Sequence, residues 1–409
     1  MRLAWGRTLL LGTGFFAVSV IASFYDSYVP KFYEGFLQSS ALVGLVMGID
    51  NLLAWTVQPF ISSLSDRTQT RLGRRLPFIL VGMPIAAILV FLLPLGRELG
   101  LWPLLAATVL LNLCLVSFRS PVIALMPDLT PQEQRSQANG LINLMGGVGS
   151  VMAALLGSRL YGLSPRYPFW FGAAIFLVVT FIFARWIREP KQPEPVDSDE
   201  PKPAALLPTL GALFREPRRM GLMLFVAMAV YMTGYQAVNT WFTLWSEQQL
   251  GIPVNEAASK LSIVGLAFIL MAVPAGFLGA RLGRRLTMAL GLGSMALVFL
   301  GIQFMGNASN LPLFLGATGI GWALVNINAY PLAVSLCGPS ETGTYTGLYY
   351  IFTGIAGTFG PGIAGQVFDL AGSKQPLFPL GAAAMGLAML LLLLWRERPA
   401  VSVGLLKAS

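Results

Sequence analysis

The chain has no histidine, few cysteines and few charged side chains. Only 11% of its 409 residues are charged, whereas a water-soluble globular protein usually has about 25%. The absence of histidine excludes a histidine proton relay and removes a common ligand of structural zinc sites. We therefore expect no metal site and no cofactor, and any proton carrier must be a carboxylate.

Apolar residues dominate what is present. They make up 55% of the chain, and the mean hydropathy is +0.69. Their long unbroken runs suit membrane-spanning helices, which need about 20 apolar residues, better than the short alternating strands of a barrel. We predict twelve helices, at 8–29, 39–65, 76–96, 101–126, 137–160, 167–187, 220–245, 257–280, 286–306, 311–337, 344–368 and 376–395. Residues 1–20 resemble a signal peptide without a cleavage site, so we predict a retained first helix.

The sequence repeats itself. The string Arg-Leu-Gly-Arg-Arg-Leu occurs at 71–76 and again at 281–286, 210 positions later, and Pro121 matches Pro331 at the same offset. Residues 188–219 are rich in proline and charge, which predicts a flexible cytoplasmic linker. We therefore predict an all-α membrane protein with an N-terminal six-helix bundle (1–187), this linker, and a pseudo-symmetric C-terminal six-helix bundle (220–409).

Two parallel halves, each with a basic loop after its second helix, resemble the major facilitator superfamily. That resemblance implies a transporter whose substrate binds between the halves near mid-membrane.

The charges predict the orientation. Of 27 lysines and arginines, 20 fall at the termini or in loops on the same side. The others are Arg119, within a span, and Lys31, Arg97, Arg159, Arg166, Lys260 and Lys374 on the opposite side. Since basic loops mark the cytoplasmic side, we predict cytoplasmic termini, an integral plasma (bacterial inner) membrane protein, and no nucleic-acid partner. We expect a monomer.

The two basic hinges follow the second helix of each half. In transporters of the resembled family such a hinge latches the cytoplasmic faces of the helices. The predicted latch residues are Asp66, Arg67, Arg71, Arg74, Arg75, Asp128, Arg281, Arg284 and Arg285. The alternative is that these arginines only anchor the topology.

Three charges fall within predicted spans. A carboxylate at membrane depth is costly unless it is protonated, paired or hydrated, so Asp26 and Asp50 are candidates for proton or cation coupling. A hydrated helix end is the alternative for both. Arg119, near the membrane centre, needs a counterion or a ligand and is a candidate substrate contact.

The second half offers uncharged polar and aromatic side chains instead. Such groups suit a neutral, hydroxyl-rich ligand, although asparagines also join helices to one another. With Arg119, the predicted substrate-binding residues are Tyr235, Gln236, Asn239, Trp241, Trp322, Asn326 and Asn328.

The first hinge and residues 121–130 resemble the sucrose/proton symporter branch and the wider glycoside, pentoside and hexuronide cation symporters, including melibiose permease. There are departures. Asn112 stands where the sucrose symporters have an acid, and Ile123 where they have an arginine. Ala54 and Gln58 replace the acids associated with sodium in melibiose permease.

These patterns predict proton-coupled symport of a sugar or glycoside by alternating access, with H⁺ favoured over Na⁺. One alternative is a lipid, lysophospholipid or amphiphile transporter of the same fold, and another is a non-transporting membrane sensor. The chain has no nucleophile motif and no metal-ligand spacing, so we predict that it is not an enzyme.

Overall fold

The computed structural model describes residues 5–131, 134–189, 219–336 and 342–395, which form fourteen α-helices. The first half contains α1 (Trp5–Glu34), α2 (Ser40–Met47), α3 (Ile49–Thr56), α4 (Gln58–Arg67), α5 (Leu76–Leu99), α6 (Leu101–Leu129), α7 (Arg135–Leu163) and α8 (Tyr167–Trp186). The second contains α10 (Arg219–Leu250), α11 (Val254–Leu282), α12 (Arg284–Met305), α13 (Leu311–Val334), α14 (Thr342–Ala371) and α15 (Leu377–Leu394).

These helices make twelve spans, since α2, α3 and α4 follow one another along a single crossing. Within the described residues, eleven spans are long and apolar enough to cross a membrane. The twelfth, α14, is a helix of 30 residues. The predicted twelve-helix membrane architecture is therefore confirmed.

The second span differs from the single helix predicted at 39–65. Ser39 begins α2, and its hydroxyl accepts a hydrogen bond from the N–H of Leu42 at 3.3 Å. A first break falls at Gly48 and a second at Val57. Pro59 explains the second break, because proline has no N–H to donate to the carbonyl four residues earlier.

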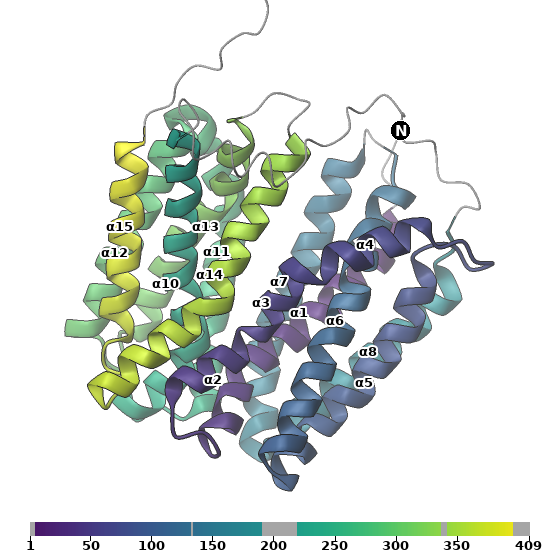
Figure 1. Ribbon diagram of the computed structural model, residues 1–409, viewed down its shortest axis with the longest axis horizontal. Coiled ribbons are helices and arrows are strands. Elements are labelled where there is room, and N and C mark those ends of the chain that lie inside the picture. The colour runs from purple at the N-terminus through teal and green to yellow at the C-terminus, as the bar shows by residue number, and fades with distance from the viewer. Residues whose placement is uncertain (1–4, 132–133, 190–218, 337–341, 396–409) are drawn as a thin grey trace, which may run out of the picture.

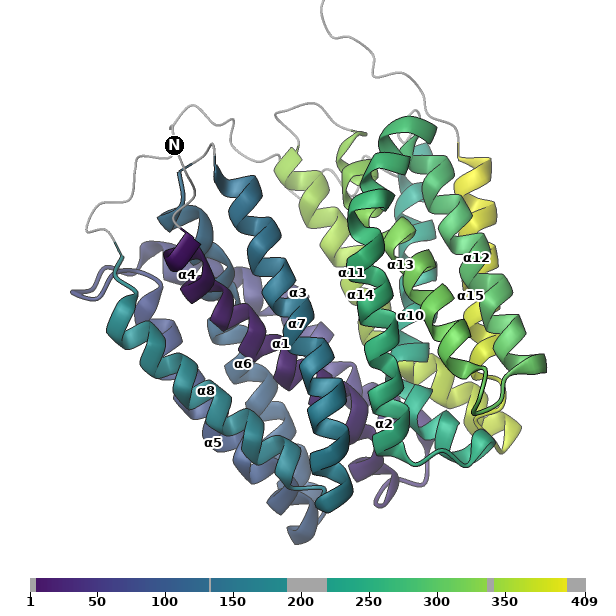
Figure 2. The ribbon, with the colours of Figure 1, turned by 180° about the vertical axis from the view of Figure 1, so that it is seen from behind.

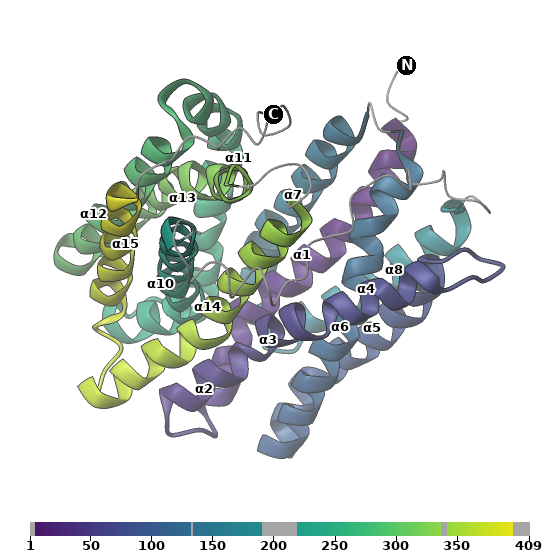
Figure 3. The same cartoon turned by 45° about the horizontal axis from the view of Figure 1, so that its top comes forward.

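The helices form two groups, α1–α8 and α10–α15 (Figures 1 and 3). Within the first group α1 packs on α7, and α5 packs on α6 and α8; within the second, α10 packs on α14 and α15. We call the end where α4 leads into α5 the hinge end, and the end where α1 finishes the far end. The groups diverge toward the hinge end and converge toward the far end (Figures 1 and 2).

The predicted domain boundaries remain a prediction. Residues 190–218 of the predicted linker lie outside the described residues, as does Cys337, one of the two cysteines.

Glycines bring α2 and α14 into backbone contact near the far end. A Cβ atom built on Gly44 would lie 2.2 Å from the carbonyl oxygen of Pro361, and one on Gly365 would lie 2.2 Å from that of Ser40. At the start of α3, a Cβ on Gly48 would lie 2.0 Å from the carbonyl oxygen of Thr358. Any larger residue would push the helices apart, so these glycines permit the close approach of the two groups.

A second contact between the groups joins α7 to α11. A Cβ built on Gly147 would lie 2.8 Å from the side chain of Ile269. Nearer the far end, the amide of Asn255 donates to the carbonyl oxygen of Ser158 at 3.4 Å. The two groups therefore meet along both sides of a space between them.

Candidate functional site

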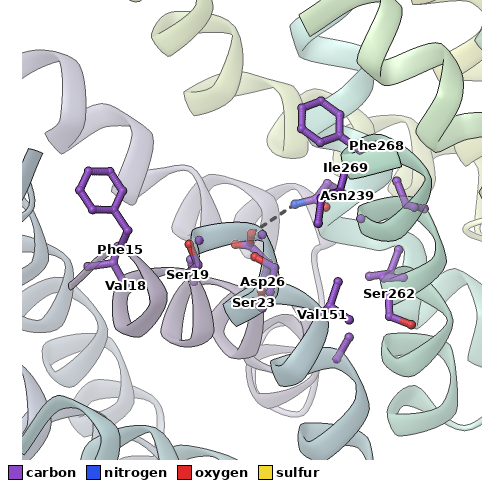
Figure 4. A pocket seen from close by; sticks show the side chains of 18 of the residues that line it. Phe15, Val18, Ser19, Ser23, Asp26, Val151, Asn239, Ser262, Phe268 and Ile269 are labelled. Atoms are coloured by element: carbon purple, nitrogen blue, oxygen red, sulfur yellow. Dashed lines mark hydrogen bonds between the residues drawn. The ribbon is translucent and has the colours of Figure 1, made fainter. Parts of the chain in front are cut away.

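A cavity of about 640 Å³ lies between the two groups of helices. Its lining comes from α1, α6 and α7 of the first group and from α10, α11 and α13 of the second. Most of the lining side chains are apolar, among them Phe15, Val18, Phe268 and Ile269 (Figure 4). The cavity thus offers a largely apolar volume of the size that small organic ligands occupy.

Asp26 of α1 and Asn239 of α10 bridge the two groups inside this cavity. The Asn239 side-chain amide donates to Oδ2 of Asp26 at 3.2 Å (Figure 4). Ser19 and Ser23 precede Asp26 at helical spacing and also line the cavity. This polar stripe of α1 was not identified from the sequence, although its spacing of three and four residues in an apolar run would have revealed it.

Arg119 of α6 lines the same cavity, with its side chain exposed to it. Among the described residues no carboxylate lies within ion-pair distance of its guanidinium, but its charge acts on both Asp26 and Asp50. Asp50, in the first turn of α3, is half-buried and accepts a hydrogen bond from the Asn51 amide at 2.8 Å. One base and one acid, Arg119 and Asp26, therefore face the cavity, and Asp50 does not line it.

Aromatic rings form another part of the wall. Tyr235 of α10 and Trp322 of α13 are stacked, with ring centroids 3.6 Å apart and planes at 5° to each other. Both line the cavity. They offer an apolar face close to the polar pair of Asp26 and Asn239, which suits a ligand with both polar and apolar surface.

Four of the eight predicted substrate-binding residues line the cavity: Arg119, Tyr235, Asn239 and Trp322. Gln236 and Asn326 lie outside the lining. Trp241 is buried and donates its indole N–H to the carbonyl oxygen of Pro361 at 2.9 Å. Asn328 is also buried and donates to the carbonyl oxygen of Ala275 at 3.2 Å, which joins α13 to α11. These contacts explain the polarity of Trp241 and Asn328 without a ligand.

The first hinge gathers around Asp128, near the end of α6. Its carboxylate accepts hydrogen bonds from Arg74 at 2.6 Å and from Arg75 at 3.1 Å. Arg75 also pairs with Asp66. Arg67 and Arg71 are exposed and make no ion pair with a described residue. The described hinge contacts lie within α1–α8, and a latch between the groups remains a prediction.

Glu189 organises the same hinge and was not identified from the sequence. Its carboxylate accepts the backbone N–H groups of Arg74, Arg75 and Leu76, the last at 2.5 Å. The N–H groups of Arg75, the N-cap residue, and Leu76 are unpaired donors at the start of α5. Gly73 has φ +114° and a Cβ there would lie 2.5 Å from Glu189, so glycine is required by both conformation and space.

Among the described residues, the arginines of the second hinge pair with no acid. Arg284 donates to the carbonyl oxygen of Pro331 at 3.0 Å, and Arg285 donates to that of Leu392 at 3.0 Å. Arg281 makes no ion pair with a described residue. Arg284 and Arg285 therefore bond to carbonyl groups in the last turns of α13 and α15.

Ion pairs join the two groups at the far end. The ammonium of Lys31 lies 2.5 Å from Glu247 of α10, and Glu34 lies 2.6 Å from Lys374. Lys31 and Glu34 also pair with each other at 3.2 Å. The sequence placed Lys31 and Lys374 on this side without revealing their partners.

Asp369 of α14 completes these far-end contacts. Its carboxylate accepts hydrogen bonds from the hydroxyl of Ser39 at 2.6 Å, from the N–H of Ser40 at 2.7 Å and from that of Ala41 at 3.1 Å. An acid of the second group thus caps a helix of the first group, where a negative charge favours the unpaired N–H groups of the first turn.

Comparison with curated proteins finds similar chains, several of which share one name. The chain is 26% identical over 421 residues to the "Multidrug resistance protein MdtH" of Yersinia pestis (strain Pestoides F), covering 98% of this chain and 95% of that one. The protein of the same name from Yersinia pseudotuberculosis serotype O:1b (strain IP 31758) is equally similar.

Solved structures share the fold at lower identity. The nucleoside transporter NupG superimposes with a TM-score of 0.76 at 16% identity, covering 95% of this chain and all of that chain. A bacterial homologue of the human lysosomal transporter Spinster gives a TM-score of 0.77 at 17% identity, covering 98% of this chain and 100% of that chain. The E. coli fucose:proton symporter FucP gives a TM-score of 0.60 at 16% identity, covering 96% of this chain and 99% of that chain.

A protein-family model described as "Major Facilitator Superfamily" matches residues 8–361 and 224–406. Since these matches cover most of the chain, the protein belongs to the Major Facilitator Superfamily, whose members are transporters and not enzymes.

Proposed function

We propose that the protein is a proton-coupled secondary transporter that binds a small amphiphilic organic molecule in the central cavity and moves it by alternating access. The observation that carries this proposal is the presence of Arg119 and Asp26 in one largely apolar cavity between the two helix groups. An unpaired guanidinium can bind a polar or anionic group of a ligand. A carboxylate within the membrane is stabilised by protonation or by a polar partner.

Asp26 is the proposed proton carrier, with Asp50 as its electrostatic neighbour. Deprotonated Asp26 attracts Arg119 and accepts the Asn239 amide. Protonation removes the negative charge and with it the attraction for Arg119, and it lowers the cost of enclosing the carboxylate in an occluded state. Binding of ligand and proton at one cavity thereby becomes coupled.

A glycoside is our first candidate substrate. Its sugar would find hydrogen-bonding partners in Asn239, Ser19 and Ser23, and its apolar part would find the stacked rings of Tyr235 and Trp322. The mostly apolar lining supports a glycoside over a free sugar, because a free sugar has little apolar surface to bury.

A drug-like amphiphile moved outward is the second candidate. The name of the MdtH relatives favours it, as does the apolar lining formed by Phe15, Phe268 and Ile269. Both candidates share the proton step and differ in the direction of coupling, so one assay separates them.

The orientation is part of the proposal. The positive-inside rule assigns the hinge end to the cytoplasm, because the basic residues of both hinges lie there. The far end, where the ion pairs join the two groups, then faces outward. On this assignment the structure represents an inward-facing state.

The test uses proteoliposomes that contain a trapped pH indicator. Addition of 4-nitrophenyl glucoside should drive proton movement in the same direction as the sugar, while glucose should give a smaller response. Asp26→Asn should lower proton movement more than tenfold while ligand exchange persists, because a neutral side chain removes only the coupling. Asp50→Asn is the matched variant and should have the smaller effect.

Ethidium, a cationic dye, should move against the proton gradient if the second candidate holds. Normal proton coupling in Asp26→Asn would refute the assignment.

A further inference from the structure

A second cavity, of about 650 Å³, lies between α7 and α11 and is distinct from the central one. We call it the α7–α11 groove, after the two helices, which lie side by side and converge toward the far end (Figure 2). Its lining residues are Val148, Val151, Met152, Leu155, Leu156, Ser158, Arg159, Ser259, Leu266 and Ile269.

Apart from Val151, the α7 residues that line the groove differ from those that line the central cavity. On α7, Val148, Met152, Leu155 and Arg159 recur every three or four residues and therefore form one helix face. Leu155 is 49% exposed and Val148 46% exposed. In a membrane protein, exposed apolar side chains on the outside of the bundle contact acyl chains. The groove is therefore accessible from the bilayer.

The groove has the length of one lipid leaflet. Val148 and Arg159 are separated by eleven positions of α7, which is about 16 Å at 1.5 Å per residue. Half of a hydrocarbon core about 30 Å thick is about 15 Å. An acyl chain in the groove would extend from mid-membrane to the far-end surface, where Arg159 lies.

Arg159 is unlike most basic residues of the far end. Lys31, Lys374 and Arg166 each form an ion pair with a glutamate. The guanidinium of Arg97 lies over the ring of Phe32, 4.9 Å from its centroid. Arg159 has no such partner among the described residues and lines an apolar groove. A guanidinium in this position is suited to a phosphate, which it binds through two parallel hydrogen bonds.

We propose that the α7–α11 groove is a binding site for one anionic phospholipid of the far-end leaflet. Its phosphate would bind Arg159, with Ser158 and Ser259 nearby, and an acyl chain would pack against Leu155, Leu266 and the other apolar lining residues. The site is independent of the transported substrate, because it accepts a bilayer component from the membrane side.

The groove and the central cavity share two lining residues, Val151 and Ile269. A chain bound in the groove would therefore pack against the other side of a wall of the substrate cavity. It would also bridge α7 and α11, which belong to different helix groups, and so stabilise their contact at the far end.

The test is native mass spectrometry of the detergent-purified protein with added phosphatidylglycerol or phosphatidylcholine of identical chains. Phosphatidylglycerol should bind at least tenfold more tightly. Arg159→Gln should reduce that preference about tenfold, since it removes the charge and the paired hydrogen bonds. Leu155→Trp should weaken binding of both lipids because the larger side chain fills the groove.

Lys260→Gln is the matched control, since Lys260 lies on α11 near the same end but does not line the groove. It should leave the lipid preference unchanged. Equal affinity for the two lipids, an equal loss in Lys260→Gln, or a dimer of the protein in place of a bound lipid would overturn the proposal. Should Leu155→Trp fail to fold, the comparison of Arg159→Gln with Lys260→Gln decides alone.

Discussion

The two ends of the helix bundle are held together differently. At the far end, ion pairs join α1 to α10 and to the segment after α14, and Asp369 of α14 caps α2. At the hinge end, the ion pairs among the described residues all lie within the first group: Asp128 pairs with Arg74 and Arg75, and Arg75 also pairs with Asp66. The ion pairs that join the two groups among the described residues thus lie at the far end, whereas those of the first hinge involve the first group alone.

Burial adds to this difference. The side chains of Lys31 and Glu247 are 32% and 38% exposed, whereas those of Arg75 and Asp128 are 7% and 15% exposed. Exposed pairs contribute roughly 1 kcal/mol or less, but removal of one partner from a buried pair costs about 3–5 kcal/mol. The ion pairs of the far end should therefore break more easily than those of the hinge end. The close approach of the two groups at the far end then depends mainly on the glycine contacts.

The largest expected effect comes from Gly48→Val. The new Cβ would lie 2.0 Å from the carbonyl oxygen of Thr358, so α3 must move away from α14. We expect hydrogen exchange of the backbone of residues 40–56 to accelerate at least tenfold, measured by mass spectrometry. Gly386→Val is the control, because a Cβ at Gly386 meets nothing within 4 Å. Similar exchange in both variants would show that this contact does not hold the far end closed.

Asp128→Asn should have the next largest effect, and at the opposite end. Both Arg74 and Arg75 would lose their charged acceptor, which should lower the free energy of unfolding by about 3 kcal/mol. Denaturant unfolding in detergent measures this loss. Asp66→Asn is the matched variant, because Asp66 is 53% exposed and, among the described residues, pairs with Arg75 alone, so it should lose less than about 1 kcal/mol. Equal losses would contradict the central role of Asp128.

The helices were predictable from the sequence, because continuous apolar runs require helices in lipid and the charges between them mark the ends. The repeated hinge predicted the two halves. The breaks at Gly48 and Val57 were not predicted. Pro59 was the signal for the second, whereas glycine is tolerated within membrane helices and the close approach of Gly48 to Thr358 is visible only in the structure.

The candidate site was predictable only in part. Arg119 and Asp26 were found because charge in an apolar run is costly, and both line the cavity. Trp241 and Asn328 lie outside it, since polarity alone does not distinguish a ligand contact from a bond to a neighbouring helix. The far-end pairs could not be predicted, because Lys31 and Glu247 are 216 positions apart and Glu34 and Lys374 are 340 apart. Their pairing depends on which end of the bundle is closed.

The smallest effect is expected from reversing one far-end charge. Lys31→Glu should place three acids together and shift the open and closed populations of the far end about fivefold, because half-exposed pairs contribute about 1 kcal/mol. The double variant Lys31→Glu with Glu247→Lys should restore the original exchange rate of residues 40–56. Restoration isolates the pair with Glu247, since the double variant remakes that pair while Glu34 still lacks Lys31. Wild-type protein in 1 M salt, where the Debye length is about 3 Å, should shift in the same direction as Lys31→Glu but less. A double variant as open as the single one would show that the pair does not hold the two groups together.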